Sequence, residues 1–92
     1  MKTFNDLEFN SFPPIDGMDI RDGVYAKIMF ENGLGASVIK TSFSYGGKNG
    51  LYEVAVLDTD GEITYETDVT DDVIGHLTPE QVTETMAFIQ AL

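Results

Sequence analysis

Two strand-like runs meet at an Asp-Gly pair in the stretch Gly50-Leu-Tyr-Glu-Val-Ala-Val-Leu-Asp-Thr-Asp-Gly-Glu-Ile-Thr-Tyr-Glu-Thr67. An Asp-Gly pair between alternating apolar residues is the strongest short-range signal for a β-hairpin with a two-residue turn, in which both turn residues need a positive φ. With Asp60 and Gly61 as the turn, Val56 faces Tyr65 across the hairpin. The stretch therefore predicts a half-buried antiparallel sheet.

Two Asn-Gly pairs predict that this sheet continues on its N-terminal side. Asn32-Gly33 follows an alternating run from Val24 to Phe30, and Asn49-Gly50 precedes Leu51. If each pair forms a two-residue turn, all three hairpins place the same apolar side chains on one face. A longer loop at Gly46-Gly47 is equally compatible with the sequence and would shift the register by a bulge. The predicted inner face consists of Val24, Ala26, Ile28, Phe30, Ile39, Phe43, Tyr45, Tyr52, Val54, Val56, Ile63 and Tyr65.

The start of a C-terminal helix is marked by several agreeing signals. Thr78 suits the N-cap position, Pro79 suits the first helical position, and Gln81 completes a capping box with Thr78. Because the sheet has one apolar face that needs burial, the apolar stripe of this helix is predicted to pack on it. That stripe consists of Val82, Met86 and Ile89.

The remaining segments complete an α+β fold in one domain, residues 1–92. Pro13-Pro14 disfavours a helix or a central strand, so residues 1–23 are predicted to form an irregular N-terminal arm, with a short edge strand near Leu7–Phe9 as the alternative. A helical turn is predicted from Thr70 to Gly75. The expected architecture is a four-stranded antiparallel β-meander over residues 24–67, with one helix over residues 78–92 packed on one face.

The charge of the chain is unusual in both size and distribution. Sixteen acidic residues against five basic ones give a net charge of −11. The basic residues are Lys2, Arg21, Lys27, Lys40 and Lys48, so residues 49–92 contain none. Such a field repels nucleic acids and anionic membranes, and it speeds the encounter with a basic partner. The alternative is that the acidic surface serves solubility alone.

The sequence predicts no catalytic, cofactor-binding or metal-binding site. His76 is the single histidine, it has no evident partner, and the chain has no cysteine. The stretch Asp58-Thr-Asp-Gly-Glu62 has alternating carboxylates, but its glycine comes too early for a calcium-binding loop. The N-terminus lacks the layout of a signal peptide, and no apolar run approaches the ~20 residues that span a bilayer. We therefore expect a soluble, cytoplasmic, non-enzymatic protein.

Three segments carry a resemblance to a group of short, acidic proteins of tailed phages and prophages. The segments are Asn32-Gly-Leu-Gly-Ala-Ser-Val-Ile39, Ser44-Tyr-Gly-Gly-Lys-Asn-Gly-Leu-Tyr-Glu-Val-Ala-Val-Leu57, and Ile63-Thr-Tyr65 followed by Thr70-Asp-Asp-Val-Ile-Gly-His-Leu-Thr78. The resemblance covers most of the chain and implies a viral origin and a bacterial host cell, but it implies no activity. By analogy, small acidic phage proteins often bind host machinery, including mimics of nucleic acid that block restriction or CRISPR enzymes.

These observations predict an acidic binding protein that engages and inhibits a basic, nucleic-acid-binding host protein. The candidate partner-binding residues are Glu53, Glu62, Glu66, Asp68, Asp71 and Asp72. The alternative is an assembly module, such as a homodimer, that uses a mildly apolar outer sheet face unless the N-terminal phenylalanines cover that face. This alternative interface consists of Met29, Leu34, Val38 and Leu57, with Ala36 between them. Neither hypothesis involves direct contact with nucleic acid or with a membrane.

Overall fold

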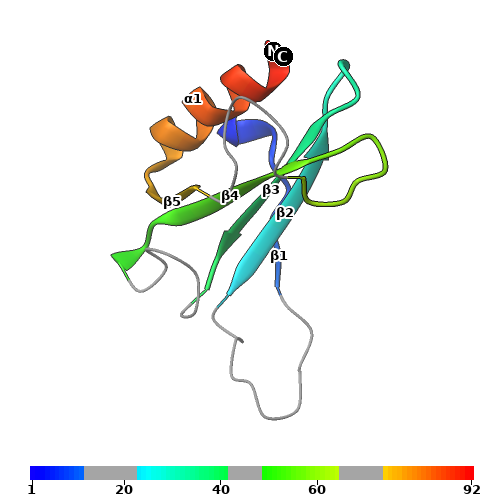
Figure 1. Cartoon of the computed structure of the whole chain (residues 1–92). Coiled ribbons are helices and arrows are strands. Elements are labelled where there is room, and N and C mark those ends of the chain that lie inside the picture. The colour runs from blue at the N-terminus through cyan, green and yellow to red at the C-terminus, as the bar shows by residue number, and fades with distance from the viewer. Residues whose placement is uncertain (12–22, 42–48, 65–73) are drawn as a thin grey trace.

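The computed structural model describes residues 1–11, 23–41, 49–64 and 74–92. It contains an antiparallel five-stranded sheet in the order β1-β2-β3-β4-β5, with α1 packed across one face (Figure 1). The α+β class is confirmed, although four strands were predicted. The strands are β1 (Asn10–Ser11), β2 (Val24–Met29), β3 (Gly35–Lys40), β4 (Tyr52–Leu57) and β5 (Ile74–Leu77). The helices are the 3-10 turn η1 (Phe4–Asp6) and α1 (Pro79–Gln90).

The edges of the sheet differ from the prediction. The N-terminal arm contains η1 and a short edge strand, but that strand is β1 and not the segment near Leu7–Phe9. The predicted helical turn is wrong at Ile74, which lies in β5 and pairs with Val54 of β4. Tertiary pairing overrides local propensity in such a short segment. In place of the predicted strand after Gly61, the described residues contain an isolated antiparallel β-bridge between Leu57 and Ile63. Residues 65–67 of that predicted strand lie outside the described residues.

Both described Gly-containing hairpin loops have three residues instead of two. In the first loop, Phe30 N–H donates to the Leu34 carbonyl at 2.7 Å, and Gly33 N–H donates to the Phe30 carbonyl at 3.1 Å. In the second loop, Asp58 N–H donates to the Glu62 carbonyl at 2.7 Å, and Gly61 N–H donates to the Asp58 carbonyl at 2.9 Å. The loops are therefore Glu31–Gly33 and Thr59–Gly61.

Backbone angles explain why the two-residue turn was the wrong prediction. Gly33 and Gly61 have φ of 90° and 79°, whereas His76 is the one residue other than glycine with a positive φ in the described part of the chain. Asn32 and Asp60 therefore lack the positive φ that a two-residue type I′ turn requires. A three-residue loop of this kind requires a positive φ only at its last residue, which is the glycine.

The extra loop residue shifts the strand register by one. Ala26 lies opposite Val38, where a two-residue turn would place it opposite Ile39. Because side chains alternate between the faces of a sheet, the shift moves Ala36 and Val38 to the inner face and removes Ile39 and Ile63 from it. Ala26, Ile28, Phe30, Val54 and Val56 keep their predicted inner positions. The buried core consists of Phe30, Ala36, Val38, Val54, Val56, Leu77, Val82, Met86 and Ile89.

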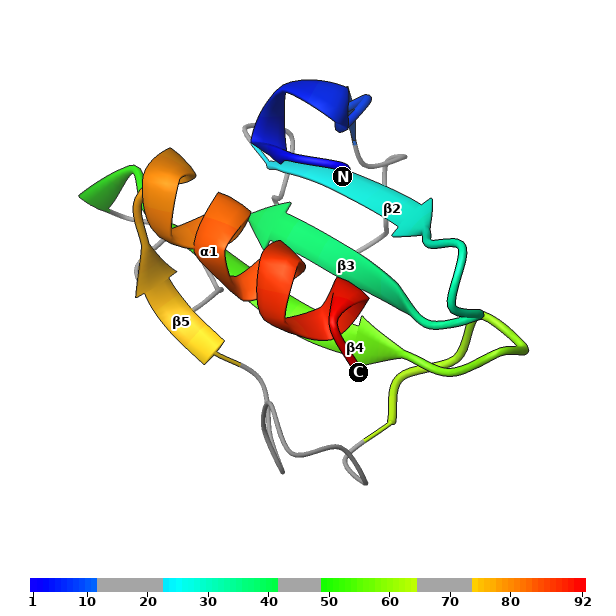
Figure 2. The ribbon, with the colours of Figure 1, turned by 90° about the horizontal axis from the view of Figure 1, so that it is seen from above.

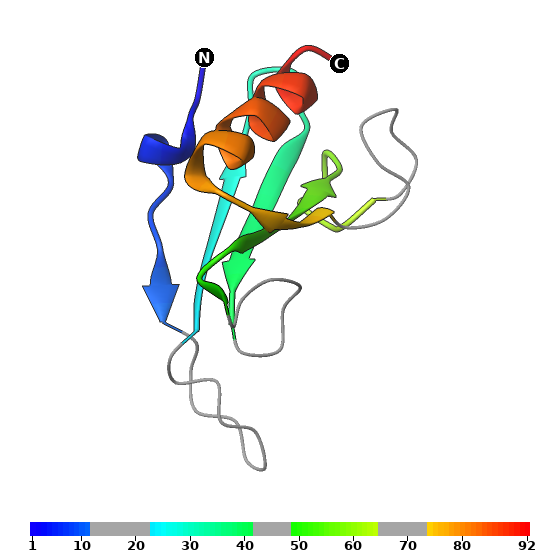
Figure 3. The same cartoon turned by 90° about the vertical axis from the view of Figure 1, so that its left-hand side faces the viewer.

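The start of the C-terminal helix was predicted correctly, although α1 ends at Gln90 and not at residue 92. The Thr78 side-chain oxygen accepts a hydrogen bond from the Gln81 N–H at 3.3 Å, and Thr78 N–H donates to Gln81 Oε1 at 2.8 Å. The apolar stripe faces the sheet, with Val82, Met86 and Ile89 each fully buried, and Figure 3 shows α1 on one side of the strands. The core contains both Leu77, which precedes the N-cap, and Val82 in the first turn of α1.

The N-terminal arm packs beside α1 on the inner side of the sheet (Figure 2). The rings of Phe4, Phe9 and Tyr52 form a cluster with centroid distances of 5.1–5.6 Å. Phe4 N–H donates to Thr83 Oγ1 at 3.0 Å. These phenylalanines therefore cover a flank of the core and not the outer face, while Phe12 lies outside the described residues.

We expect Met86→Ala to lower the free energy of unfolding by about 2–4 kcal/mol, because it removes a fully buried side chain and leaves a cavity. Chemical denaturation measures this difference. Phe88→Ala is the matched control on the same helix, since Phe88 is 66% exposed, and it should change stability by no more than about 0.5 kcal/mol. Equal stability of the two variants would contradict the packing of α1.

Alanine substitutions distinguish the two possible loop geometries. Gly61→Ala should cost about 1 kcal/mol, because alanine is strained at a positive φ. Asp60→Ala should cost no more than about 0.5 kcal/mol, because Asp60 is exposed and has a negative φ. Thermal or chemical unfolding compares the variants. A two-residue turn would require both positions to be left-handed, so comparable losses would argue against the three-residue loop.

Candidate functional site

The apolar outer patch suggested by the sequence is not present as predicted. Val38 is fully buried on the inner face, and Leu34 packs against the core. Leu57 does lie on the outer face by alternation, but it is 1% exposed, which leaves Met29 as the exposed member of the set. A methyl group added at Gly35 would lie 2.5 Å from the Met29 sulfur, so the Met29 side chain partly fills the space above that glycine.

Two of the six predicted acidic positions can be located. Glu53 lies on the outer face of β4 opposite Ile39 and is half-buried. Glu62 is exposed and closes the second loop with Asp58. Because Ile63 pairs with Leu57, alternation turns Glu62 away from the face of Glu53, so these two carboxylates do not form one surface. The other four, Glu66, Asp68, Asp71 and Asp72, lie outside the described residues.

The structure instead gathers carboxylates at one end of the sheet. The loops Glu31–Gly33 and Thr59–Gly61 lie side by side there (Figure 2), and a methyl group added at Gly33 would lie 3.2 Å from Thr59 Cγ2. We call this region the acidic end. Its carboxylates belong to Glu31, Asp58, Asp60 and Glu62.

The four carboxylates of the acidic end have different roles. Asp58 Oδ1 accepts hydrogen bonds from the Asp60 N–H at 2.9 Å and the Glu62 N–H at 3.1 Å, so this carboxylate shapes its own loop. Such side-chain bonds to nearby backbone stabilise turns. Glu31, Asp60 and Glu62 are exposed. These three side chains are therefore available to a partner.

Asn32 fixes the first loop of the acidic end to α1. Its Nδ2 donates to the Ile89 carbonyl at 2.9 Å and to the Leu92 carbonyl at 3.3 Å, and its Oδ1 accepts from the Leu34 N–H at 3.1 Å. The last carbonyls of a helix lack intrahelical partners, and the last turn of α1 contains no basic residue. The Asn32 amide satisfies this need and positions the acidic end at the same time.

Basic side chains are scarce around the acidic end. The described basic residues are Lys2, Lys27 and Lys40, and the Lys40 ammonium lies 5.1 Å from the centroid of the Tyr52 ring. Lys2 lines a shallow hollow between the N-terminus and the first loop, together with Glu31 and Gln90. Lys2 is held there by its backbone, because Lys2 N–H donates to Gln90 Oε1 and Gln90 Nε2 donates to the Lys2 carbonyl, each at 2.8 Å.

His76 has a structural role in β5. It is exposed and has a φ of 58°, and it sits where the β4–β5 register shifts, between the pairs Val54–Ile74 and Tyr52–Leu77. One extra residue in β5 at this point is the signature of a β-bulge. Within the described ranges, no three histidine, aspartate or glutamate side chains are arranged to hold a metal ion.

Comparison with known proteins returned no matching family model, no matching curated protein and no matching solved structure. In the described part of the chain, no helix has the length and apolar character needed to cross a membrane.

Sequence reasoning missed Glu31 and the contribution of Asp60 to the acidic end. Both lie in loops that were interpreted only as turns. Two loops at the same end of adjacent hairpins must lie near each other in an antiparallel meander, and that topology could have placed their carboxylates together. The cluster depends on three-dimensional proximity, because Glu31 and Glu62 are far apart in the sequence.

Proposed function

We propose that this chain is a non-enzymatic binding protein of phage or prophage origin that occupies a basic, nucleic-acid-binding surface of a host protein and inhibits it. The observation that carries the proposal is charge: the net charge is −11, and residues 49–92 contain no lysine or arginine. The origin rests on the sequence resemblance described above, and inhibition follows if nucleic acid and this chain compete for one surface.

The arrangement of the exposed carboxylates supports the proposal. Glu31, Asp60 and Glu62 come from two adjacent loops, so their charges are gathered in one region. A rigid anionic surface attracts basic partners and accelerates their association in a salt-sensitive manner. Neighbouring strands lie ~4.8 Å apart, which allows carboxylates on adjacent segments to imitate the repeated charges of a nucleic-acid backbone.

Anchoring of the acidic end also supports the proposal. Asp58 Oδ1 holds the second loop through two backbone N–H groups, and Asn32 joins the first loop to the end of α1. Binding then requires little additional ordering of the backbone, which lowers the entropic cost of association. A scaffold of this kind presents charges in fixed positions to a partner that binds DNA through lysine and arginine.

Charge reversal tests the acidic end as the binding surface. Asp60→Lys with Glu62→Lys should weaken binding to the host protein by at least about tenfold, because close charge pairs at interfaces are strongly coupled. The matched control combines Asn5→Lys, Glu8→Lys and Asn10→Lys, exposed positions on the N-terminal arm that produce the same change in net charge. The control should retain most of the affinity if position matters as well as total charge.

The partner is obtained by affinity capture from a bacterial lysate at low salt and is then tested with labelled duplex DNA by fluorescence anisotropy. We expect the chain to displace the duplex, with an affinity that falls steeply as salt increases. Two results would contradict the proposal: a ternary complex in which the partner holds both DNA and this chain, or equal weakening by the acidic-end variant and its control.

A further inference from the structure

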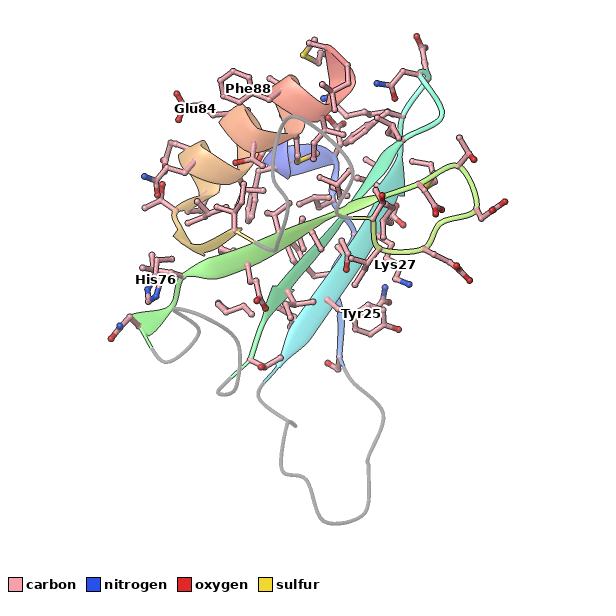
Figure 4. The ribbon with its side chains drawn as sticks, viewed as in Figure 1. Tyr25, Lys27, His76, Glu84 and Phe88 are labelled. Carbon is pink, nitrogen blue, oxygen red and sulfur yellow. The ribbon has the colours of Figure 1, made fainter. Side chains whose placement is uncertain are left out.

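The side of α1 turned away from the sheet carries two kinds of exposed side chain. Glu80, Glu84 and Phe88 are all exposed and recur at four-residue intervals, which places them along one side of the helix. Phe88 is 66% exposed, and Leu92, four residues further on, is 47% exposed. Figure 4 shows Glu84 and Phe88 projecting from α1 into solvent.

Glu84 and Phe88 are neighbours on this surface. Side chains four residues apart in a helix have Cβ atoms about 5–6 Å apart, and helical side chains lean toward the N-terminus. The Phe88 ring therefore leans toward the turn that carries Glu84. The pair presents an aromatic face next to a carboxylate, which is the combination that a guanidinium group prefers, since it stacks on rings and donates paired hydrogen bonds to carboxylates.

Among the described residues, the ammonium found over an aromatic ring is that of Lys40 and not one over Phe88. No lysine or arginine occurs in residues 49–92, so α1 has no basic residue at helical spacing from Glu84. Among the described residues, the ring contacts join Phe4, Phe9 and Tyr52, and the ammonium lying over a ring is that of Lys40 over Tyr52. No described ring or cation covers Phe88.

Charge decides which kind of partner fits this surface. A second copy of this chain would bring together two molecules that each carry a net charge of −11, and it would add the carboxylates of Glu80 and Glu84 to the contact. Like-charge juxtaposition of this kind opposes association. An anionic membrane or a nucleic acid is repelled for the same reason. A basic protein segment is complementary both to the glutamates and to the ring.

We infer that Glu84 and Phe88 form an arginine-recognition pair, in which an arginine of the basic partner stacks on the Phe88 ring and donates hydrogen bonds to the Glu84 carboxylate. The inference rests on the proposed function, because the partner is the same basic protein. It adds a contact that distinguishes arginine from lysine, which the acidic end cannot do by charge alone. Aromatic residues in contact with arginine are frequent anchors of protein interfaces.

Two synthetic peptides of equal length and charge serve as probes, one carrying arginines and one carrying lysines at the same positions in a Gly-Ser background. Each is titrated into the full chain, and binding is mapped by the shifts of backbone amide signals in nuclear magnetic resonance spectra. We expect the arginine peptide to bind about 2- to 5-fold more tightly. The largest additional shifts should occur in residues 84–88.

Variants separate the aromatic contact from general attraction. Phe88→Leu keeps an apolar side chain but removes the ring, so it should abolish the preference for arginine while leaving the affinity for the lysine peptide unchanged. Glu84→Gln should weaken binding of both peptides more than Glu8→Gln, which removes the same charge from the N-terminal arm. Both helix positions are exposed, and unchanged melting temperatures would confirm that the variants are folded.

The outcomes distinguish this inference from the proposed function. If the arginine preference survives Phe88→Leu, or if shifts are confined to residues 31–33 and 58–62, the helix pair is not a recognition site and the acidic end stands alone. If neither peptide causes shifts anywhere at low salt, both the inference and the proposed function are wrong.

Discussion

A left-handed glycine at the third position of the two hairpin loops Glu31–Gly33 and Thr59–Gly61 controls the arrangement of the described strands. Gly33 and Gly61 have positive φ, and each closes a three-residue loop. Other residues are strained in that conformation, so a glycine at this position stabilises the three-residue loop. Because side chains alternate along a strand, the loop length decides which set of β3 residues meets α1. Ala36 and Val38 are buried in the core for this reason.

Several separate contacts hold α1 to the N-terminal arm and to the first hairpin loop. Asn32 donates to the Ile89 carbonyl and Gln90 exchanges two hydrogen bonds with Lys2, while Thr83, in the first half of the helix, accepts from Phe4. The helix therefore connects the N-terminal arm to the first hairpin loop. This connection places the acidic end next to the end of α1, while Glu80, Glu84 and Phe88 on the opposite side of the helix are exposed.

The sequence was informative where one local interaction determines the structure. The start of α1 depends on Thr78 and Gln81, which lie within one turn, and its prediction was correct at the residue level. The six residues of β4 and the apolar stripe with Met86 at its centre were also predicted from periodicity. Both features follow from the spacing of apolar residues along the chain, which can be read directly from the sequence.

The prediction failed where two geometries share one sequence signature. Asn-Gly and Asp-Gly occur in two-residue turns and also at the end of three-residue loops. The three predicted turns agreed on one inner face, but the two described loops were both predicted one residue too short, so this agreement was misleading. β5 was missed because its pairing with β4 includes a bulge at His76. The acidic end was only partly predicted, because the proximity of Glu31 to Glu62 is created by the packing of two loops.

The register therefore links fold and candidate function, and interstrand contacts measured by nuclear Overhauser effects test it most directly. In the register described here, Lys27 lies opposite Ser37 at a position where Hα atoms approach closely, and Thr59 lies next to Gly33. The account predicts a strong effect between the Hα atoms of Lys27 and Ser37, together with contacts between the Thr59 methyl group and Gly33. A strong effect between Ile28 and Ser37, without the Thr59 contacts, would contradict the three-residue loops and the acidic end that they form.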